Sequence, residues 1–284
     1  MSQACAAKPA LNPTRWEARL GLRFERAGGR TVLADRRHSG PLVVQKALYP
    51  EGDAVCHAVI VHPPGGIAGG DRLEIEAALD PGAHALITTP GATRWYRTSG
   101  PEAAQTVKLR VAAGATLEWL PQETIFFEGC RARNRIEFDV EPGARLLAWE
   151  IACLGRVRSS ERFARGEAFQ SLSLHAGGRL RWTERGRLAA GNRALGSSVG
   201  LGGHSVFGTL LASAPGLDAG LVAACREPGP AIGEGAVTLL PYALVARFLG
   251  PSAESARDYF SALWRILRPA LLGQEGTEPR IWRT

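Results

Sequence analysis

The stretch IEFDVEPGARLLAWEI, residues 136–151, decides the fold class of this chain. Polar and apolar residues alternate before its glycine and an apolar run follows it, so two β-strands meet at a turn. Three further stretches repeat this arrangement: IEAALDPGAHALITT around Gly82, VKLRVAAGATLEWL around Gly114, and LSLHAGGRLRWTER around Gly178. Successive glycines lie 32, 29 and 35 residues apart. Because one such unit cannot bury its apolar face alone, we expect an all-β dominated fold of stacked sheets, either a sandwich or a β-helix-like pile.

The segments on either side of the repeat fit one domain over residues 1–284, with residues 1–14 disordered. Residues 30–50 and 54–64 are expected to form strands, interrupted at Gly40-Pro41 and Pro63-Pro64, and the Gly- and Ser-rich residues 191–203 a loop. One or two helices are expected. The clearest is an amphipathic helix over 253–268, capped by Ser252, ended by Pro269, and packed on the sheets or on a partner.

The composition excludes several classes of protein. Of the 284 residues, 45% are hydrophobic and 21% charged, which is typical of a globular chain. No apolar run approaches the roughly 18 residues that cross a bilayer, and no signal peptide is visible, so we expect a cytoplasmic protein without membrane contact. The net charge of +7 comes from scattered arginines, which argues against nucleic-acid binding. The five cysteines never form C-x-x-C, which argues against a disulfide framework or a zinc ribbon.

The Gly-rich stretch HPPGGIAGGD, residues 62–71, resembles a phosphate-binding loop only superficially. A P-loop needs Lys and Ser or Thr after its last glycine, and here Asp71 follows, whose carboxylate repels phosphate. An anion cradle is therefore disfavoured against two other interpretations: a tight structural loop, or a loop shaped to meet a partner. The candidate partner-facing residues are Pro63, Pro64, Gly65, Gly66, Gly69 and Gly70.

Metal-binding and catalytic signatures are weak. Cys56 and His62 share a strand face but lie six residues apart, on the order of 20 Å, and His57 points to the other face, so they cannot chelate one ion locally. No H-E-x-x-H, G-x-S-x-G or recognisable triad pattern is present. We expect no stable metal site, no tightly bound cofactor and no catalytic residue. A small-molecule enzyme built on a β-sandwich and a polyanion-binding module remain the rival classes.

Glu150 is the most anomalous residue, because it lies in LLAWEIACL, a strand that is apolar on both faces. Burying a carboxylate is costly unless it is paired, protonated or hydrated. Three explanations remain open: a salt bridge to an arginine, a polar internal passage or binding site, or simple exposure. Glu123 and Glu128, which flank residues 124–127, raise the same question more weakly.

Six stretches in order resemble the UreD (UreH) family of urease accessory proteins, from Trp16 to Thr284. They are GPLVVQKALYPEG, CHAVIVHPPGGIAGGDRLEI, HALITTPGATRWYRT, LEWLPQETIFFEG, WEIACLGR and PRIWRT. One departure is that GQEGTEPRIWRT lacks the cysteine expected before P-R-I-W, which bears on a C-terminal contact and not on membership.

The resemblance implies a non-enzymatic chaperone that helps to insert nickel into urease. It implies three partners: apo-urease, the helical accessory protein UreF, and through the complex the nickel-carrying GTPase UreG. It further implies an internal passage for transient nickel, for which the candidate residues are Glu150, Asp71, Glu123, His62 and Cys153. The rival interpretation is that these residues only support the fold.

Overall fold

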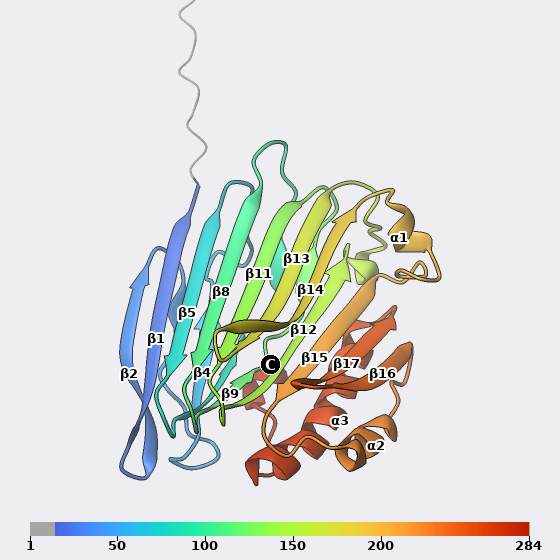
Figure 1. Cartoon of the computed structure of the whole chain (residues 1–284). Coiled ribbons are helices and arrows are strands. Elements are labelled where there is room, and N and C mark those ends of the chain that lie inside the picture. The colour runs from blue at the N-terminus through green and yellow to red at the C-terminus, as the bar shows by residue number, and fades with distance from the viewer. Residues whose placement is uncertain (1–14, 284) are drawn as a thin grey trace, which may run out of the picture.

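The computed structural model describes residues 15–283, and the expected disorder of residues 1–14 lies outside them. Two sheets are stacked face to face (Figure 1). In spatial order, the seven-stranded sheet consists of β14 (Arg179–Ala189), β13 (Glu167–Ala176), β11 (Arg131–Val140), β8 (Ala103–Val111), β5 (Arg72–Leu79), β1 (Glu17–Ala27) and β2 (Arg30–Ser39). The ten-stranded sheet consists of β16 (Glu234–Leu240), β17 (Ala243–Gly250), β15 (Val206–Ser213), β12 (Arg145–Leu154), β9 (Thr116–Trp119), β6 (His84–Thr88), β4 (Cys56–Val61) and β3 (Val43–Val44). To these are added β10 (Thr124–Phe126), which pairs with β12, and β7 (Thr93–Trp95), which pairs with β10.

Three of the four repeat units carry the chain from one sheet to the other. The turns at Gly82, Gly114 and Gly143, all with positive φ, connect β5 to β6, β8 to β9 and β11 to β12. Successive units then pair in parallel within each sheet, as in β5 with β8 and β6 with β9. The expected β-rich fold of stacked sheets is therefore confirmed, in its β-helix-like form.

The fourth unit plays a different role. The turn at Gly177 and Gly178 closes an antiparallel hairpin between β13 and β14 inside the seven-stranded sheet. Both glycines have positive φ, which suits a tight hairpin whose twist matches its strands. This hairpin ends the parallel stacking, and β14 becomes an edge strand of the sheet.

The C-terminal segment covers one face of the ten-stranded sheet with helices (Figure 1). The expected helix is present as α3 (Ala253–Leu272), capped by Ser252, but it does not end at Pro269 as predicted. Pro269 lies in the last turn, where its missing N–H removes a single intrahelical bond, and Gly273 in the left-handed conformation ends the helix instead. The shorter α2 (Ala219–Arg226) packs beside α3, and α1 (Arg193–Gly196) is a single turn within the predicted loop.

The strand β12 is buried on both faces, as its sequence indicates. One face, with Leu146 and Ala152, contributes to the core between the two sheets. The other face, with Trp149 and Ile151, contributes to a second core beneath α3. Side chains on alternate positions of this strand therefore enter two different environments. Among residues 15–283 no helix is both long and apolar enough to cross a membrane.

Candidate functional site

Glu150 lies on the face of β12 that points between the sheets, and it is 4% exposed. Among the described residues its only hydrogen-bond donor is the indole of Trp119, whose Nε1 is 2.8 Å from Glu150 Oε1. Burial raises the pKa of this carboxyl to about 7, against a smaller opposing effect of the Trp119 hydrogen bond. Across the described part of the chain Glu150 forms no ion pair, so the salt-bridge and exposure interpretations are both wrong.

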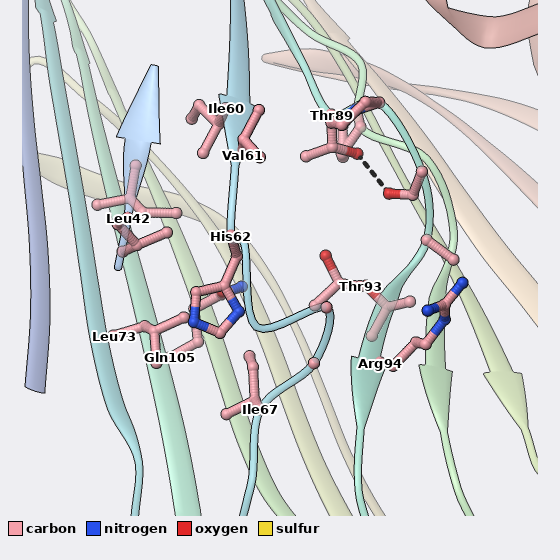
Figure 2. A pocket seen from close by; sticks show the side chains of 18 of the residues that line it. Leu42, Ile60, Val61, His62, Ile67, Leu73, Thr89, Thr93, Arg94 and Gln105 are labelled. Atoms are coloured by element: carbon pink, nitrogen blue, oxygen red, sulfur yellow. Dashed lines mark hydrogen bonds between the residues drawn. The ribbon is translucent and has the colours of Figure 1, made fainter. Parts of the chain in front are cut away.

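A cavity of about 230 Å³ adjoins Glu150. Figure 2 shows side chains of β4, the Gly-rich loop and the segment 89–94 around this space. Its polar lining includes His62, Gln105, Trp119 and Thr124. Burial lowers the pKa of His62, while the charge of Asp71 opposes this effect, and His62 Nε2 is buried without a hydrogen-bond partner among the described residues. The structure therefore brings Glu150 and His62 to one cavity.

The Gly-rich loop forms part of the wall of this cavity through Gly65 and Gly66. A Cβ atom on Gly66 would lie 2.5 Å from the Tyr96 ring, and one on Gly69 would lie 2.1 Å from Thr98 Oγ1, so both glycines permit a close approach of chain segments. Pro63 and Pro64 are exposed at the start of the loop. The tight packing explains these two glycines, and a partner-facing role for the loop stays a prediction.

Asp71 is not among the residues that line the cavity. Its carboxylate accepts hydrogen bonds from the backbone N–H of Trp16 at 2.9 Å and of Ala68 at 2.8 Å. Both oxygens are thereby engaged in closing the end of the Gly-rich loop and fixing the start of β1. The structure assigns this residue a local structural contact.

Glu123 and Cys153 lie together at a different place. Cys153 points to the opposite side of β12 from Glu150, and both Glu123 and Cys153 line a cavity of about 460 Å³ beside the start of α3. Glu123 forms an ion pair with Arg257 at 3.0 Å, and burial raises the pKa of the Cys153 thiol to about 12. The five candidate residues are thus divided among three locations.

A further cavity of about 380 Å³ lies at the other end of the space between the sheets, against β14, β15 and β17. Its polar lining includes Gln170, Glu184, Thr209 and Arg247. Thr209 donates to Glu184 at 3.1 Å, and Arg247 forms an ion pair with the same carboxylate. The sequence analysis missed these residues, although Gln170 occupies an inward position of a strand otherwise lined by Ala168, Leu172 and Leu174.

Two polar rows connect the cavity at Glu150 with the one at Thr209. On the seven-stranded sheet, Gln105, Asn134 and Gln170 are neighbours in register on β8, β11 and β13. Gln105 Nε2 donates to Asn134 Oδ1 at 3.2 Å, whereas Asn134 Nδ2 and Gln170 Oε1 are buried without a partner among residues 15–283. On the facing sheet, Glu150, Thr209 and Arg247 are neighbours in register. Buried polar groups without partners are rare in folded proteins and indicate a bound water, an ion or a functional role.

A second buried glutamate, Glu118 on β9, was also missed by the sequence analysis. It faces α3 and is fully buried. Its carboxylate contacts three side chains: Arg268 at 3.1 Å, Trp264 Nε1 at 2.7 Å and His84 Nε2 at 2.7 Å. Arg268 also pairs with Glu51, which contacts His57 at 2.6 Å. The signal was visible in TLEWL, where Glu118 interrupts an apolar run as Glu150 does in LLAWEIACL.

Side chains that favour metal ions do not gather into one cluster in the described part. Among residues 15–283 no group of three or more His, Cys, Asp or Glu side chains is placed to hold an ion. Glu150 and His62 therefore offer a cation isolated contacts along a cavity wall and not a closed coordination shell.

Comparison with known proteins gives the family. The family model of the UreD urease accessory protein matches residues 17–283. The chain belongs to the UreD family. Proteins named urease accessory protein UreD are similar over nearly their whole length: the Azoarcus sp. (strain BH72) protein is 51% identical over 95% of this chain and 94% of its own. Those of Dechloromonas aromatica (strain RCB) and Nitrosococcus oceani are each 49% identical, over 98% and 100% of this chain and 97% and 95% of theirs.

Membership in the UreD family confirms the resemblance seen in the six stretches of sequence. It implies a role in urease maturation, and it places the chain among accessory proteins and not among enzymes. This agrees with the expectation of a non-enzymatic accessory protein.

Proposed function

We propose that this chain is the adaptor between apo-urease and the other accessory proteins, UreF and the GTPase UreG, and that it assists nickel insertion through the space between its two sheets. The observation that carries the proposal is Glu150, a buried carboxylate that lies beside a cavity and has no ion-pair partner within residues 15–283. Family membership supports the role in maturation. The two polar rows support a route through the protein.

The side chains of the two polar rows suit the transient passage of a cation better than its stable binding. Carboxylate, amide and hydroxyl oxygens accept a divalent cation, but a conduit must bind weakly enough at each point to release it. Glu150 supplies one negative charge near the start of the rows, and its raised pKa of about 7 means that both protonation states are populated near neutral pH. Loss of the proton from this carboxylate leaves a negative charge in the cavity wall that attracts a cation. Glu184, already paired with Arg247, lies at the other end.

Of the other candidates, His62 is the one placed to act with Glu150 at the same cavity. Its imidazole is favoured in the neutral form by burial, which is the form that binds a metal ion. Glu123 and Cys153 lie outside this route, on the α3 side of β12, and Asp71 is engaged with backbone N–H groups. The proposed passage consists of His62, Glu150 and the two polar rows.

The adaptor role is tested by maturing urease with its other accessory proteins in the presence and absence of this chain. Pull-down and nickel quantification are the readouts. We expect a complex that contains urease and the accessory proteins, with nickel loading that depends on this chain. Urease that fills with nickel without the chain, together with no binding to urease or UreF, would contradict the proposal.

The passage is tested separately with the double variant Gln105→Leu, Gln170→Leu, which replaces two amides of one polar row by apolar groups of similar size. We expect normal assembly of the complex but slower nickel loading of urease. The matched control is Thr106→Val, which alters the adjacent residue on the outward face of β8 and is expected to load normally. Equal loading rates in all three proteins would remove the amide row from the route.

A further inference from the structure

Five exposed arginines lie at one end of the outer face of the seven-stranded sheet, on β11 and β14. We call this surface the arginine face; it consists of Arg131, Arg133, Arg135, Arg185 and Arg187, with Phe169 and Ser171 of β13 between them. In register, Ser171 lies between Arg135 and Arg185. Since neighbouring strands are about 4.8 Å apart, the two arginine-bearing strands are roughly 10 Å apart across β13.

The arginine face has positive charge that its own acidic residues do not neutralise. Arg133 pairs with Glu102 at 2.8 Å, and Arg187 pairs with Glu167 at 2.7 Å. In the described part of the chain, Arg135 and Arg185 have no acidic partner, and Arg131 donates to the carbonyl of Gly100. The arginine face thus contains five cations and two paired anions.

The other end of the same sheet provides a contrast. There, Arg19 on β1 pairs with Glu74 at 3.1 Å, and Arg23 pairs with Asp80 at 2.6 Å and with Glu25 at 2.9 Å. Positive and negative side chains are balanced on that part of the sheet. The excess of positive charge is therefore a local property of β11 to β14.

The centre of the arginine face contains an aromatic side chain, Phe169. Phe169 is half-buried, and the guanidinium of Arg133 lies 5.1 Å from the centre of its ring. On the other side Phe169 is in register with Arg187. An aromatic side chain flanked by arginines is the composition that dominates the binding energy of protein interfaces.

We propose that the arginine face is the docking surface for an acidic face of apo-urease. The proposal rests on the adaptor role inferred above. The arginines are spread over β11 and β14 across the intervening β13, so this face suits a broad folded surface better than it suits a single helix that docks in a groove. Two of its five arginines are paired with glutamates, which makes a nucleic acid the less favoured occupant.

The test compares two double charge reversals in the full chain, each assembled with its accessory partner. The first, Arg135→Glu with Arg185→Glu, inverts the two unpaired cations. The matched control, Arg26→Glu with Arg36→Glu, makes the same change in net charge on two exposed arginines of the β1–β2 hairpin at the opposite edge of the sheet. Binding to immobilised apo-urease is measured by biolayer interferometry at low and high salt, and the melting temperature confirms folding.

We expect the first variant to bind urease about tenfold more weakly or worse at low salt, with a reduced dependence on salt, and the control to remain within about twofold of the wild type. Binding by the first variant equal to that of the wild type would overturn the docking surface and leave the adaptor role intact. A wild-type chain that fails to bind urease would overturn the adaptor role itself. Loss of binding only to a single-stranded RNA probe, with urease binding retained, would identify a polyanion site and also overturn the proposal.

Discussion

Glu118 and Glu150 are two buried glutamates on neighbouring strands whose surroundings differ sharply. Glu118 on β9 faces α3, and Glu150 on β12 faces the space between the sheets. Glu118 contacts Arg268, His84 and Trp264, whereas Glu150 accepts one hydrogen bond from Trp119. The same residue type in a similar apolar run therefore has a compensated charge in one core and an uncompensated charge in the other.

The pKa values of the two carboxyls move in opposite directions for this reason. Burial raises the pKa of Glu118, but the hydrogen bond from His84 and the charge of Arg268 outweigh it, so the pKa lies below its ordinary value. Burial dominates at Glu150 and the pKa rises to about 7. The compensated charge of Glu118 stabilises the packing of α3 on the sheet. The uncompensated carboxylate of Glu150 lies beside a cavity and can contact a cation there.

The largest expected effect is a loss of stability when the ion pairs around Glu118 are broken. Arg268→Leu leaves Glu118 and Glu51 buried without their shared cation, and breaking a buried ion pair on one side costs about 3–5 kcal/mol. We expect a marked loss of the free energy of unfolding in denaturant titrations. The control Arg265→Leu removes an arginine whose ion pair with Glu278 lies near the surface, and it should cost about 1 kcal/mol or less. Equal losses in both variants would mean that the buried network does not hold α3.

The next effect concerns the pH dependence of stability at Glu150. Its folded pKa is above the ordinary value of 4.5, so the folded state holds a proton that the unfolded state releases, and the wild type loses stability as pH rises from about 4.5 to 7. The loss is roughly 3 kcal/mol, since each pKa unit corresponds to about 1.4 kcal/mol.

Glu150→Gln removes that dependence. Relative to the wild type, we expect the variant to be more stable at pH 8 by a few kcal/mol and to show little difference at pH 4.5, measured by urea unfolding at both pH values. A matched change at the other glutamate, Glu118→Gln, has the opposite sign because its folded pKa is lowered: the variant should be the less stable protein at pH 8. If the Glu150→Gln variant were destabilised equally at both pH values, this would contradict the inference that the buried charge of Glu150 is uncompensated.

The smallest expected effect concerns the hydrogen bond from Trp119 and its influence on the pKa of Glu150. Trp119→Phe removes the indole N–H that lowers the pKa of Glu150, so that pKa should rise further. The measurement is the midpoint of the stability–pH profile. Trp149→Phe is the control, because its indole donates to the carbonyl of Pro121 and not to a carboxylate, and the midpoint should stay unchanged.

The strand pattern and the repeat of positive-φ glycines were sufficient to predict the stacked sheets, and the two-sided burial of β12 was visible in LLAWEIACL. Which partner Glu150 meets was not visible, because Trp119 is 31 residues away and adjoins it only after the units stack. The same is true of Glu118 and Arg268, which are 150 residues apart. The structure places Asp71, Glu123 and Cys153 away from the cavity at Glu150. Strand parity and turn contacts separate them, and neither can be read from residue types alone.

The helix end was misjudged for a local reason. Proline breaks a helix interior, but in the last turn the missing N–H removes one bond, and Gly273 supplies the left-handed residue that ends α3. Arg268, the residue before this proline, thereby stays helical and reaches Glu118 beneath the helix.

The most direct test of the central claim measures stability and nickel delivery in the same variant, Glu150→Gln. Its melting temperature at pH 8 and the nickel content of urease matured with it are determined side by side with the wild type. We expect opposite signs: a melting temperature at or above that of the wild type, and less nickel in urease from an intact accessory complex. Unchanged nickel loading, or a joint fall in stability and loading, would contradict this expectation and leave Glu150 as a residue that only supports the fold.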